Sequence, residues 1–438
     1  MKTFITRLKG VVNNDTLKKI GELRVKVSKM SNPTGENRVI ILNTQKPLTI
    51  TVNGDGYITD STLSENKGKI LSIPVGSSTF YVSNGDYTLS IPNKYYLTSF
   101  CSAKEQTFNR NDVQMELDDF KFCKLMTILK LNNSKVSGDI ASLKDLSALA
   151  SLNISDTQVS GDIASLKGLS TLASLNISNT QVSGDIASLK GLSALAGLYI
   201  TSTQVSGDIA SLKDLSALAS LNISNTQVSG DIASLKDLSA LASLNISNTQ
   251  VSGDIASLKG LSALASLDIT STQVSGDIAS LKDLSTLASL NITSTQVSGD
   301  IASLKDLSTL ASLNISNTQV SGDIASLKGL SALASLNISN LNNLSGDLGK
   351  LPDSLLYVGG VNNSIFTWTD TSRRYILACE KLHCNNIDKM LQDMSKLEAK
   401  FKNQWAKSIN LVGSYTAASN AAIETLQSKG YTVSITPA

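Results

Sequence analysis

Histidine, cysteine and aromatic residues are all scarce in this chain of 438 residues. His383 is the single histidine, which excludes most histidine-dependent acid–base and metal chemistry. Four cysteines in a chain of this length do not make a disulfide framework, so we expect reduced thiols. The formal net charge is only +2, which argues against nucleic acid as a partner.

Long apolar runs are also missing. No stretch approaches the roughly 18 apolar residues that span a bilayer, so we expect no membrane span. The first ten residues, MKTFITRLKG, place Arg7 and Lys9 where a secretory signal would carry its apolar stretch. We therefore expect synthesis without Sec export. The chain also lacks a Walker loop, GxSxG, HExxH or a catalytic carboxylate pair, which argues against an enzyme and against a bound cofactor.

What the chain has is a repeat. The unit VSGDIASLKDLSALASLNISDTQ recurs every 23 residues in nine near-identical copies covering 136–342. A degenerate copy precedes them from Val113, and another follows at Leu344 after a one-residue insertion. One copy alone has too little apolar surface to offset the ordering of its backbone, so we expect the copies to stack. The copies begin at Val136, Val159, Val182, Val205, Val228, Val251, Val274, Val297 and Val320.

The apolar positions predict the shape of one unit. Leu149, Leu152 and Ile154 are spaced like a short strand with inward-facing side chains. The segment Ser160-Gly161-Asp162 predicts a turn, with glycine available for a positive φ. Residues 163–169 carry an apolar side chain at every third position, which predicts a short helical or 3₁₀ return.

This pattern resembles the leucine-rich repeat family. LSALASLNISDTQVSGDI is similar to its plant-like subclass, LxxLxLxxNxLSGxIP, over about residues 113–365. Two positions depart from it: Thr157 and its equivalents replace the family's Asn, and Ala164 and its equivalents replace the Pro. The resemblance implies that the Asn position forms a buried hydrogen-bonded column, which a threonine hydroxyl can build with fewer bonds.

The expected fold is an α/β leucine-rich repeat solenoid between two different flanks. Residues 1–112 predict a β-rich docking domain, with strand-like runs at 20–27, 39–42, 48–52, 70–75, 80–82 and 87–91. The segment 101–112 is expected to be the joint to the solenoid, 113–365. Residues 366–438 predict an α/β cap with a helix over 386–408, a strand at 409–412, a helix over 417–429 ended by Gly430, and a last strand carrying Tyr431, Val433 and Ile435.

The strand face of the repeat is the best candidate binding site, because the resemblance implies that this face lines a concave, ligand-binding surface. Its outward side chains form a polar lattice of serine and asparagine at about 4.8 Å per strand. Tyr199 is the only aromatic residue of 136–342, and Gly197, Tyr199 and Asp268 break the lattice; either they mark a ligand patch or they record drift within a duplicated array. The candidate residues are Ser151, Asn153, Ser155, Ser174, Asn176, Gly197, Tyr199, Asn222, Asn245, Asp268, Asn291, Asn314 and Asn337.

Three other features have structural explanations. The aspartate column starting at Asp139 supplies too few oxygens for Ca²⁺, so we expect it to accept nearby backbone N–H groups. Cys379, His383 and Cys384 are a weak zinc pattern and are more typical of buried thiols. The pair Arg373-Arg374 is expected to be solvated or to cap the array.

Three function hypotheses remain. The first is a structural and adhesive component of a tailed-phage virion. In it, residues 1–112 dock on other virion proteins and the solenoid binds a host glycan or protein. The C-terminal sequence NLVGSYTAASNAAIETLQSKGYTVSI and the repeats look similar to leucine-rich repeat proteins of gut Bacteroidota and their phages. The alternatives are a bacterial surface or secreted adhesin and an intracellular protein-interaction scaffold. Each of these three hypotheses also allows the protein to form a homo-oligomer.

Overall fold

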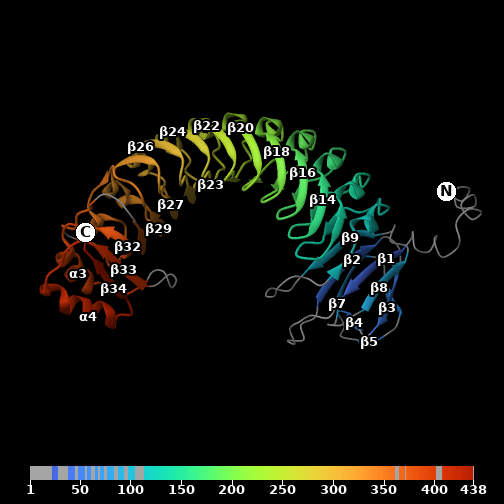
Figure 1. The fold of residues 1–438 in the computed structure, drawn as a ribbon, viewed down its shortest axis with the longest axis horizontal. Helices are drawn as coiled ribbons and strands as arrows, with labels where there is room; N and C mark the ends of the chain where they lie inside the picture. Colours follow the sequence, from blue (N-terminus) through green and yellow to red (C-terminus); the bar gives the residue numbers. More distant parts are fainter. Residues whose placement is uncertain are drawn as a thin grey trace, which may run out of the picture. The chain divides into compact units, whose positions relative to one another are not determined.

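The computed structural model describes strands within residues 22–103 and then residues 113–360, 365–369, 371–400 and 407–437. The chain divides into two compact units, Met1–Leu218 and Ala219–Ala438. Unit 1 contains the β-rich start and the first coils of the repeat, and unit 2 contains the remaining coils and the C-terminal segment (Figure 1).

Two sheets begin unit 1. One has the strand order β10-β1-β8-β3-β6 with antiparallel pairs throughout. In the other, β5, β4, β7, β2 and β9 pair antiparallel in that order. The predicted β-rich start is confirmed, although the sequence analysis missed β4, β5 and β9. The strands are β1 (Glu22–Val27), β2 (Arg38–Thr44), β3 (Leu48–Gly54), β4 (Tyr57–Asp60), β5 (Glu65–Lys67), β6 (Ile70–Ile73), β7 (Gly76–Val82), β8 (Tyr87–Pro92), β9 (Leu97–Ala103) and β10 (Val113–Gln114).

Strand β9 joins these strands to the repeat. It pairs antiparallel with β2 and parallel with the first short strand of the coils, β11 (Ile128–Lys130). Phe100 of β9 is fully buried and packs edge-to-face on Phe120 of the degenerate first coil, with ring centroids 5.4 Å apart. Of the expected joint 101–112, residues 101–103 belong to β9, and residues 104–112 lie outside the described residues. The buried Leu97 and Phe100 of β9 cover the first leucine layer, which would otherwise face water.

Each regular coil contains two strands and one 3₁₀ turn. In the coil that starts at Ser151 these are β13 (Ser151–Asn153), β14 (Gln158–Asp162) and η4 (Ile163–Leu166). The predicted short strand and 3₁₀ return are confirmed, and the apolar side chains between them are 0% exposed. Unit 1 repeats the pattern in η2 (Leu117–Phe120), β12 (Ser137–Asp139), η3 (Ile140–Leu143), β15 (Ser174–Asn176), β16 (Gln181–Asp185), η5 (Ile186–Leu189), β17 (Gly197–Tyr199), β18 (Gln204–Asp208) and η6 (Ile209–Leu212).

The predicted turn at Ser160-Gly161-Asp162 is wrong, because these residues lie in β14. This strand belongs to a second parallel ladder, in which Gly161 pairs with Val182 of the next coil. The sequence did not predict this strand, because VSGD shows no apolar alternation and contains a glycine. Gly161 has a φ of 104°, and a Cβ there would lie 2.1 Å from Oδ1 of Asp139 in the preceding coil. Both the backbone conformation and the available space therefore require glycine.

The aspartate and threonine columns hold each coil's own backbone. Oδ1 of Asp162 accepts the N–H of Ala164 at 2.8 Å and caps η4, so the structural interpretation of the aspartate column is confirmed. The hydroxyl of Thr157, which is 8% exposed, donates to the carbonyl of Ile154 at 2.7 Å. The threonine column is therefore buried, as expected, but its bonds close turns within a coil.

Unit 2 contains two parallel ladders of the same kind, one of which extends into the C-terminal segment. Its short strands pair in parallel from β19 to β31 and then through β32, β33 and β34. They are β19 (Ser220–Asn222), β21 (Ser243–Asn245), β23 (Ser266–Asp268), β25 (Ser289–Asn291), β27 (Ser312–Asn314), β29 (Ser335–Asn337), β31 (Tyr357–Gly359), β32 (Ala378–His383), β33 (Ser408–Val412) and β34 (Thr432–Thr436).

The other elements of the unit 2 coils follow the unit 1 pattern until the last coils. The second strands are β20 (Gln227–Asp231), β22 (Gln250–Asp254), β24 (Gln273–Asp277), β26 (Gln296–Asp300), β28 (Gln319–Asp323) and β30 (Leu344–Ser345). The 3₁₀ turns are η7 (Ile232–Leu235), η8 (Ile255–Leu258), η9 (Ile278–Leu281), η10 (Ile301–Leu304), η11 (Ile324–Gly329) and η12 (Leu348–Lys350). Thus η11 is longer, and β30 and η12 shorter, than their counterparts.

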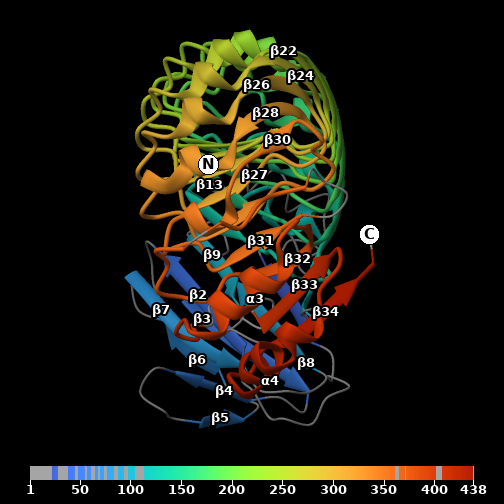
Figure 2. The same cartoon turned by 90° about the vertical axis from the view of Figure 1, so that its left-hand side faces the viewer.

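The C-terminal segment adds two helices to the extended ladder. Helix α3 (Ile387–Ser395) contacts α4 (Asn420–Ser428), and both lie beside β32–β34 (Figure 2). A 3₁₀ turn, η14 (Ala417–Ser419), precedes α4, and Gly430 follows it with a φ of 89°. The strand over 409–412, the helix over 417–429 and the last strand are thus confirmed, whereas β32 was missed.

The predicted helix over 386–408 is wrong beyond Ser395. The backbone at Glu398 bonds instead to residues 374–376: its N–H donates to Arg374, and its carbonyl accepts from Ile376. Phe401 and Trp405 lie outside the described residues. Neither described α-helix has the length and apolar character needed to cross a membrane.

Candidate ligand-binding face

The first and third residues of the short strands point away from the leucine core and form what we call the short-strand face. In unit 1 the register aligns Ser151 with Ser174 and Gly197, and Asn153 with Asn176 and Tyr199. In unit 2 it aligns Asn222, Asn245, Asp268, Asn291, Asn314 and Asn337. The serine and asparagine side chains are half-buried, while the leucine between them is fully buried. The predicted lattice therefore exists within each unit.

The asparagines of this face all turn the same way. Oδ1 of Asn245 accepts the backbone N–H of Ser247 at 3.0 Å and its hydroxyl at 2.8 Å. Asn153, Asn176, Asn222, Asn291, Asn314 and Asn337 accept the corresponding backbone N–H at 3.0–3.3 Å. Because Oδ1 is used inside the coil, the Nδ2 group remains to donate outward. The face consequently offers mainly N–H and O–H donors.

Ser155 does not belong to the outward set. We expected it to face solvent, but it is 6% exposed, and its backbone N–H donates to Oδ1 of Asn153. The strand ends at Asn153, and Asp156 then adopts a positive φ of 57°, so alternation does not continue to residue 155. A two-residue period holds only while the backbone stays extended.

Gly197 and Tyr199 form a matched pair in β17. A Cβ at Gly197 would lie 3.1 Å from Cε2 of Tyr199, so the ring lies back over the glycine. The serine that other coils carry at this position would crowd the ring. Glycine at 197 therefore makes room for the tyrosine ring two residues later.

Asp268 keeps the role of the asparagines that it replaces. Its Oδ1 accepts the backbone N–H of Thr270 at 3.0 Å and the threonine hydroxyl at 2.6 Å. The substitution exchanges one outward amide for a carboxylate oxygen while the turn is preserved. Asp268 thus changes the chemistry of the face in unit 2 without changing its backbone.

The sequence analysis missed a second tyrosine on this face. Tyr357 and Gly359 of β31 take the serine and asparagine positions, and Oη of Tyr357 donates to Oε2 of Glu380 on β32 at 2.8 Å. Burial, and then this bond to Glu380, raise the pKa of Tyr357 well above its ordinary value. The signal was available, because YVG stands where the other coils have SLN.

The cysteine and histidine cluster does not form a metal site. Cys379 and Cys384 are buried and unbridged, and burial raises the pKa of Cys379 to about 12. Within the part of the chain that the structure describes, no group of three His, Cys, Asp or Glu residues is placed to hold a metal ion. The expectation of buried thiols is confirmed.

Two solved structures with TM-scores above 0.5 support the same fold, and a third is similar at a lower score. The plant peptide hormone receptor RGFR1 in complex with RGF2 matches with a TM-score of 0.57 at 19% identity, over 78% of this chain and 62% of that chain. The PEPR1–AtPEP1 structure matches with a TM-score of 0.51 at 21% identity, over 78% and 52%. An internalin (InlF) of Listeria monocytogenes matches at 0.49 and 26% identity, over 70% and 87%. This chain thus spans under two thirds of the length of the chains in the RGFR1 and PEPR1 structures.

A family model matches most of the chain. No match was found among curated proteins. The model of the leucine-rich repeat region, in contrast, matches residues 104–413, which includes every regular coil and most of the C-terminal segment. Together with the parallel ladders and 3₁₀ returns, this match establishes that the chain belongs to the leucine-rich repeat family.

Proposed function

We propose that this protein is a non-enzymatic binding protein whose short-strand face recognises an acceptor-rich ligand, either a glycan or a protein. The observation that carries the proposal is the common orientation of the seven asparagines, which point their Oδ1 atoms into the coil. Repeated outward N–H and O–H donors suit sugar hydroxyls or peptide carbonyls through many weak contacts.

Tyr199 is the proposed anchor of the unit 1 part of this face. Its ring is half-buried over Gly197 and lies among serine and asparagine side chains. An aromatic ring held in this way offers contact area at little entropic cost and can stack on a sugar or a peptide. RGFR1 is a plant peptide hormone receptor whose structure is a complex with RGF2, which is a reason to include peptides among the ligands tested.

The setting that we propose is a particle released from a bacterial cell, with the protein as a structural and adhesive component of a tailed-phage virion. The proposal rests on the near-identity of the repeats and on the resemblance that we infer from the C-terminal sequence NLVGSYTAASNAAIETLQSKGYTVSI. Mass spectrometry of purified virions is the direct test. A virion proteome that lacks this chain would favour a cell-surface adhesin or an intracellular scaffold instead.

Binding can be tested with variants that the chain itself suggests. Asp268 shows that a carboxylate can replace the asparagine and keep the turn, so Asn245→Asp with Asn314→Asp exchanges two outward donors for acceptors without breaking the coil. Lys259→Gln with Lys282→Gln is the matched control, since these lysines follow the 3₁₀ turns.

We expect ligands found on glycan and peptide arrays to lose affinity for the asparagine variant and to keep it for the lysine control. Biolayer interferometry on the full chain measures both affinities. Equal binding by the two variants would remove the short-strand face from the proposal.

A further inference from the structure

The last coil of unit 2 is shorter than the regular ones on the side of its 3₁₀ turn. Ile324 and Leu336 stand twelve positions apart in a regular coil, whereas their equivalents Leu348 and Val358 stand ten apart. The shorter coil leaves part of the preceding one uncovered. A hollow of about 720 Å³ lies there, between η11 and the segments that follow η12 and precede β32.

Arg373 lines this hollow with a buried charge. Its side chain is 4% exposed, and its Nη1 donates to the carbonyls of Leu351 at 3.0 Å and Pro352 at 2.7 Å. Its Nη2 donates to the carbonyl of Leu355, and its Nε is buried without a hydrogen-bond partner. Neutral carbonyls satisfy donors but do not cancel a charge, so the guanidinium remains a source of positive potential.

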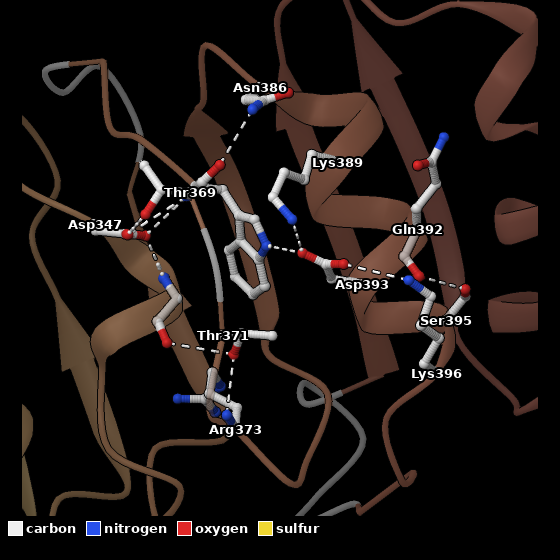
Figure 3. Close-up of polar contacts among 12 residues, drawn as sticks. Asp347, Thr369, Thr371, Arg373, Asn386, Lys389, Gln392, Asp393, Ser395 and Lys396 are labelled. Carbon is white, nitrogen blue, oxygen red and sulfur yellow. Dashed lines mark hydrogen bonds and ion pairs between the residues drawn. The ribbon is translucent and has the colours of Figure 1, made fainter.

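The backbone around Arg373 is held in place by neighbouring polar groups. Its N–H donates to Oγ1 of Thr371 at 3.0 Å, and that hydroxyl donates to the carbonyl of Gly349 at 3.3 Å. Figure 3 shows this chain of bonds beside Asp347 and Thr369. Burial lowers the pKa of Arg373 to about 10, so the side chain keeps its charge at neutral pH.

Two lysines line the same hollow. Lys328 lies at the end of η11 and Lys350 in η12, and both are exposed. Neither forms an ion pair with another described residue. Their ammonium groups can therefore turn toward a ligand that enters the hollow.

The acidic groups of the hollow are already engaged. Oδ1 of Asp323 accepts the N–H of Ala325 at 2.8 Å, and Oδ1 of Asp353 accepts the N–H of Arg374 at 2.6 Å. Three cations against two carboxylates leave the lining with one net positive charge. One net positive charge suits a ligand that carries one anionic group.

We propose that the hollow lined by Lys328, Lys350 and Arg373 binds an oxyanion group, such as a carboxylate or a sulfate, carried by a small ligand or a sugar residue. The lysines contact the oxyanion directly, and Arg373 attracts it from the wall of the hollow. The hydroxyls of Ser326 and Ser372 supply donors for the rest of the ligand. The volume lies within the usual range for small-molecule sites. This site is separate from the short-strand face and does not depend on its function.

The repeat provides a matched control. Lys305 directly follows η10, and Lys328 holds the equivalent position in the next coil, where it lies within the longer η11. Unlike Lys328, Lys305 does not line the hollow. The test compares the full-length protein with Lys328→Gln, Lys350→Gln and Lys305→Gln. Because these lysines are exposed, the variants are expected to unfold at nearly the same temperature without added anion.

Sodium sulfate and sodium acetate are the probes, titrated by isothermal calorimetry at ionic strength held constant with chloride. We expect saturable binding to the wild type and to Lys305→Gln, with at least a tenfold loss in Lys328→Gln and Lys350→Gln. Binding of sulfate alone assigns the hollow to tetrahedral oxyanions, and binding of acetate alone assigns it to carboxylates. Absence of saturable binding with both probes, or equal affinity in all four proteins, overturns the proposal.

Discussion

The regular coils of unit 2 and its C-terminal segment meet the same chemical requirement with different groups. In two of the regular coils a threonine does so: Thr286 donates its hydroxyl to the carbonyls of Ser262 and Leu264 in the preceding coil, at 2.8 and 2.9 Å, and Thr309 does the same one coil later. The other three coils carry alanine at this position. At the end of the repeat, the carbonyl of Leu355 stands at the position of Leu264, and the guanidinium of Arg373 reaches it instead. A threonine contact that recurs in two coils is replaced there by an arginine that occurs once.

The same contrast appears elsewhere in the C-terminal segment. Nε1 of the fully buried Trp368 donates to Oδ2 of Asp393 at 3.0 Å, and Lys389 bonds to the same oxygen at 2.9 Å (Figure 3). Asp347 caps η12 as its equivalents cap other 3₁₀ turns, and it also accepts from the backbone and hydroxyl of Thr369. We conclude that stability is shared among many equal contacts in the coils and concentrated in a few residues at the end.

The largest expected effect is at Arg373. Arg373→Met removes the donors of three buried carbonyls, which we expect to lower the free energy of unfolding by about 3 kcal/mol at about 1 kcal/mol per lost bond. Urea unfolding followed by circular dichroism measures it. Arg374→Met is the control: Arg374 is exposed and bonds to Glu398 at 3.2 Å, so its loss is expected to change little. Equal losses of unfolding free energy in Arg373→Met and Arg374→Met would contradict the conclusion that a few residues stabilise the C-terminal segment.

Glycine in the second ladder gives the next largest effect. Gly276 has a φ of 104°, and an added Cβ would lie 2.2 Å from Oδ1 of Asp254, so Gly276→Ala should cost about 2 kcal/mol through strain and displaced capping. A Cβ added at Gly260 would have no atom within 4 Å, so Gly260→Ala should change the free energy of unfolding by no more than about 0.5 kcal/mol. Thermal unfolding of the pair distinguishes them, and a comparable loss in both would argue against the second ladder.

The threonine column predicts a smaller, local effect. Thr249→Val removes a hydroxyl that donates to the carbonyl of Ile246 at 2.6 Å and leaves that acceptor without its bond, which should cost about 1 kcal/mol. Affinity for a ligand of the short-strand face should not change, since Thr249 is 7% exposed. Chemical unfolding and interferometry on the same sample measure both quantities. A loss of affinity with unchanged stability would reverse this assignment.

Tyr199 should show the smallest effect on stability. Tyr199→Ser restores a small polar side chain beside Gly197 on a half-buried surface, so we expect a change within about 0.5 kcal/mol. Ligand affinity should fall if the ring is an anchor. Paired melting and binding measurements test this, and a large loss of stability would mean that the ring is a packing residue.

Much of the short-strand face could be predicted from one coil, but its chemistry could not. The spacing of Leu149, Leu152 and Ile154 identified the inward side, and Asn153 followed as an outward residue. The burial of Ser155 and the common direction of the asparagine amides depend on a backbone that turns after residue 153. Alternation in a sequence contains no information about where a strand ends.

The boundaries of the domains after 112 and 365 stay predictions. Strand β9 nevertheless pairs on both sides, with β2 of the β-rich start and β11 of the first coil. The sequence could not reveal that pairing, because Leu97–Ala103 has no counterpart in the repeat.

The period of 23 residues, its leucine positions and its Gly-Asp pairs were enough to establish stacked coils, because each requirement is local and recurs in every copy. Tertiary structure alone decided the second ladder, the burial of Arg373 and the hollow beside Lys328. The second ladder pairs strands of consecutive coils that show no apolar alternation along the chain. The other two features arise where a coil meets a neighbour that differs from it. A local residue pattern cannot specify these contacts, since the partners stand tens of residues apart.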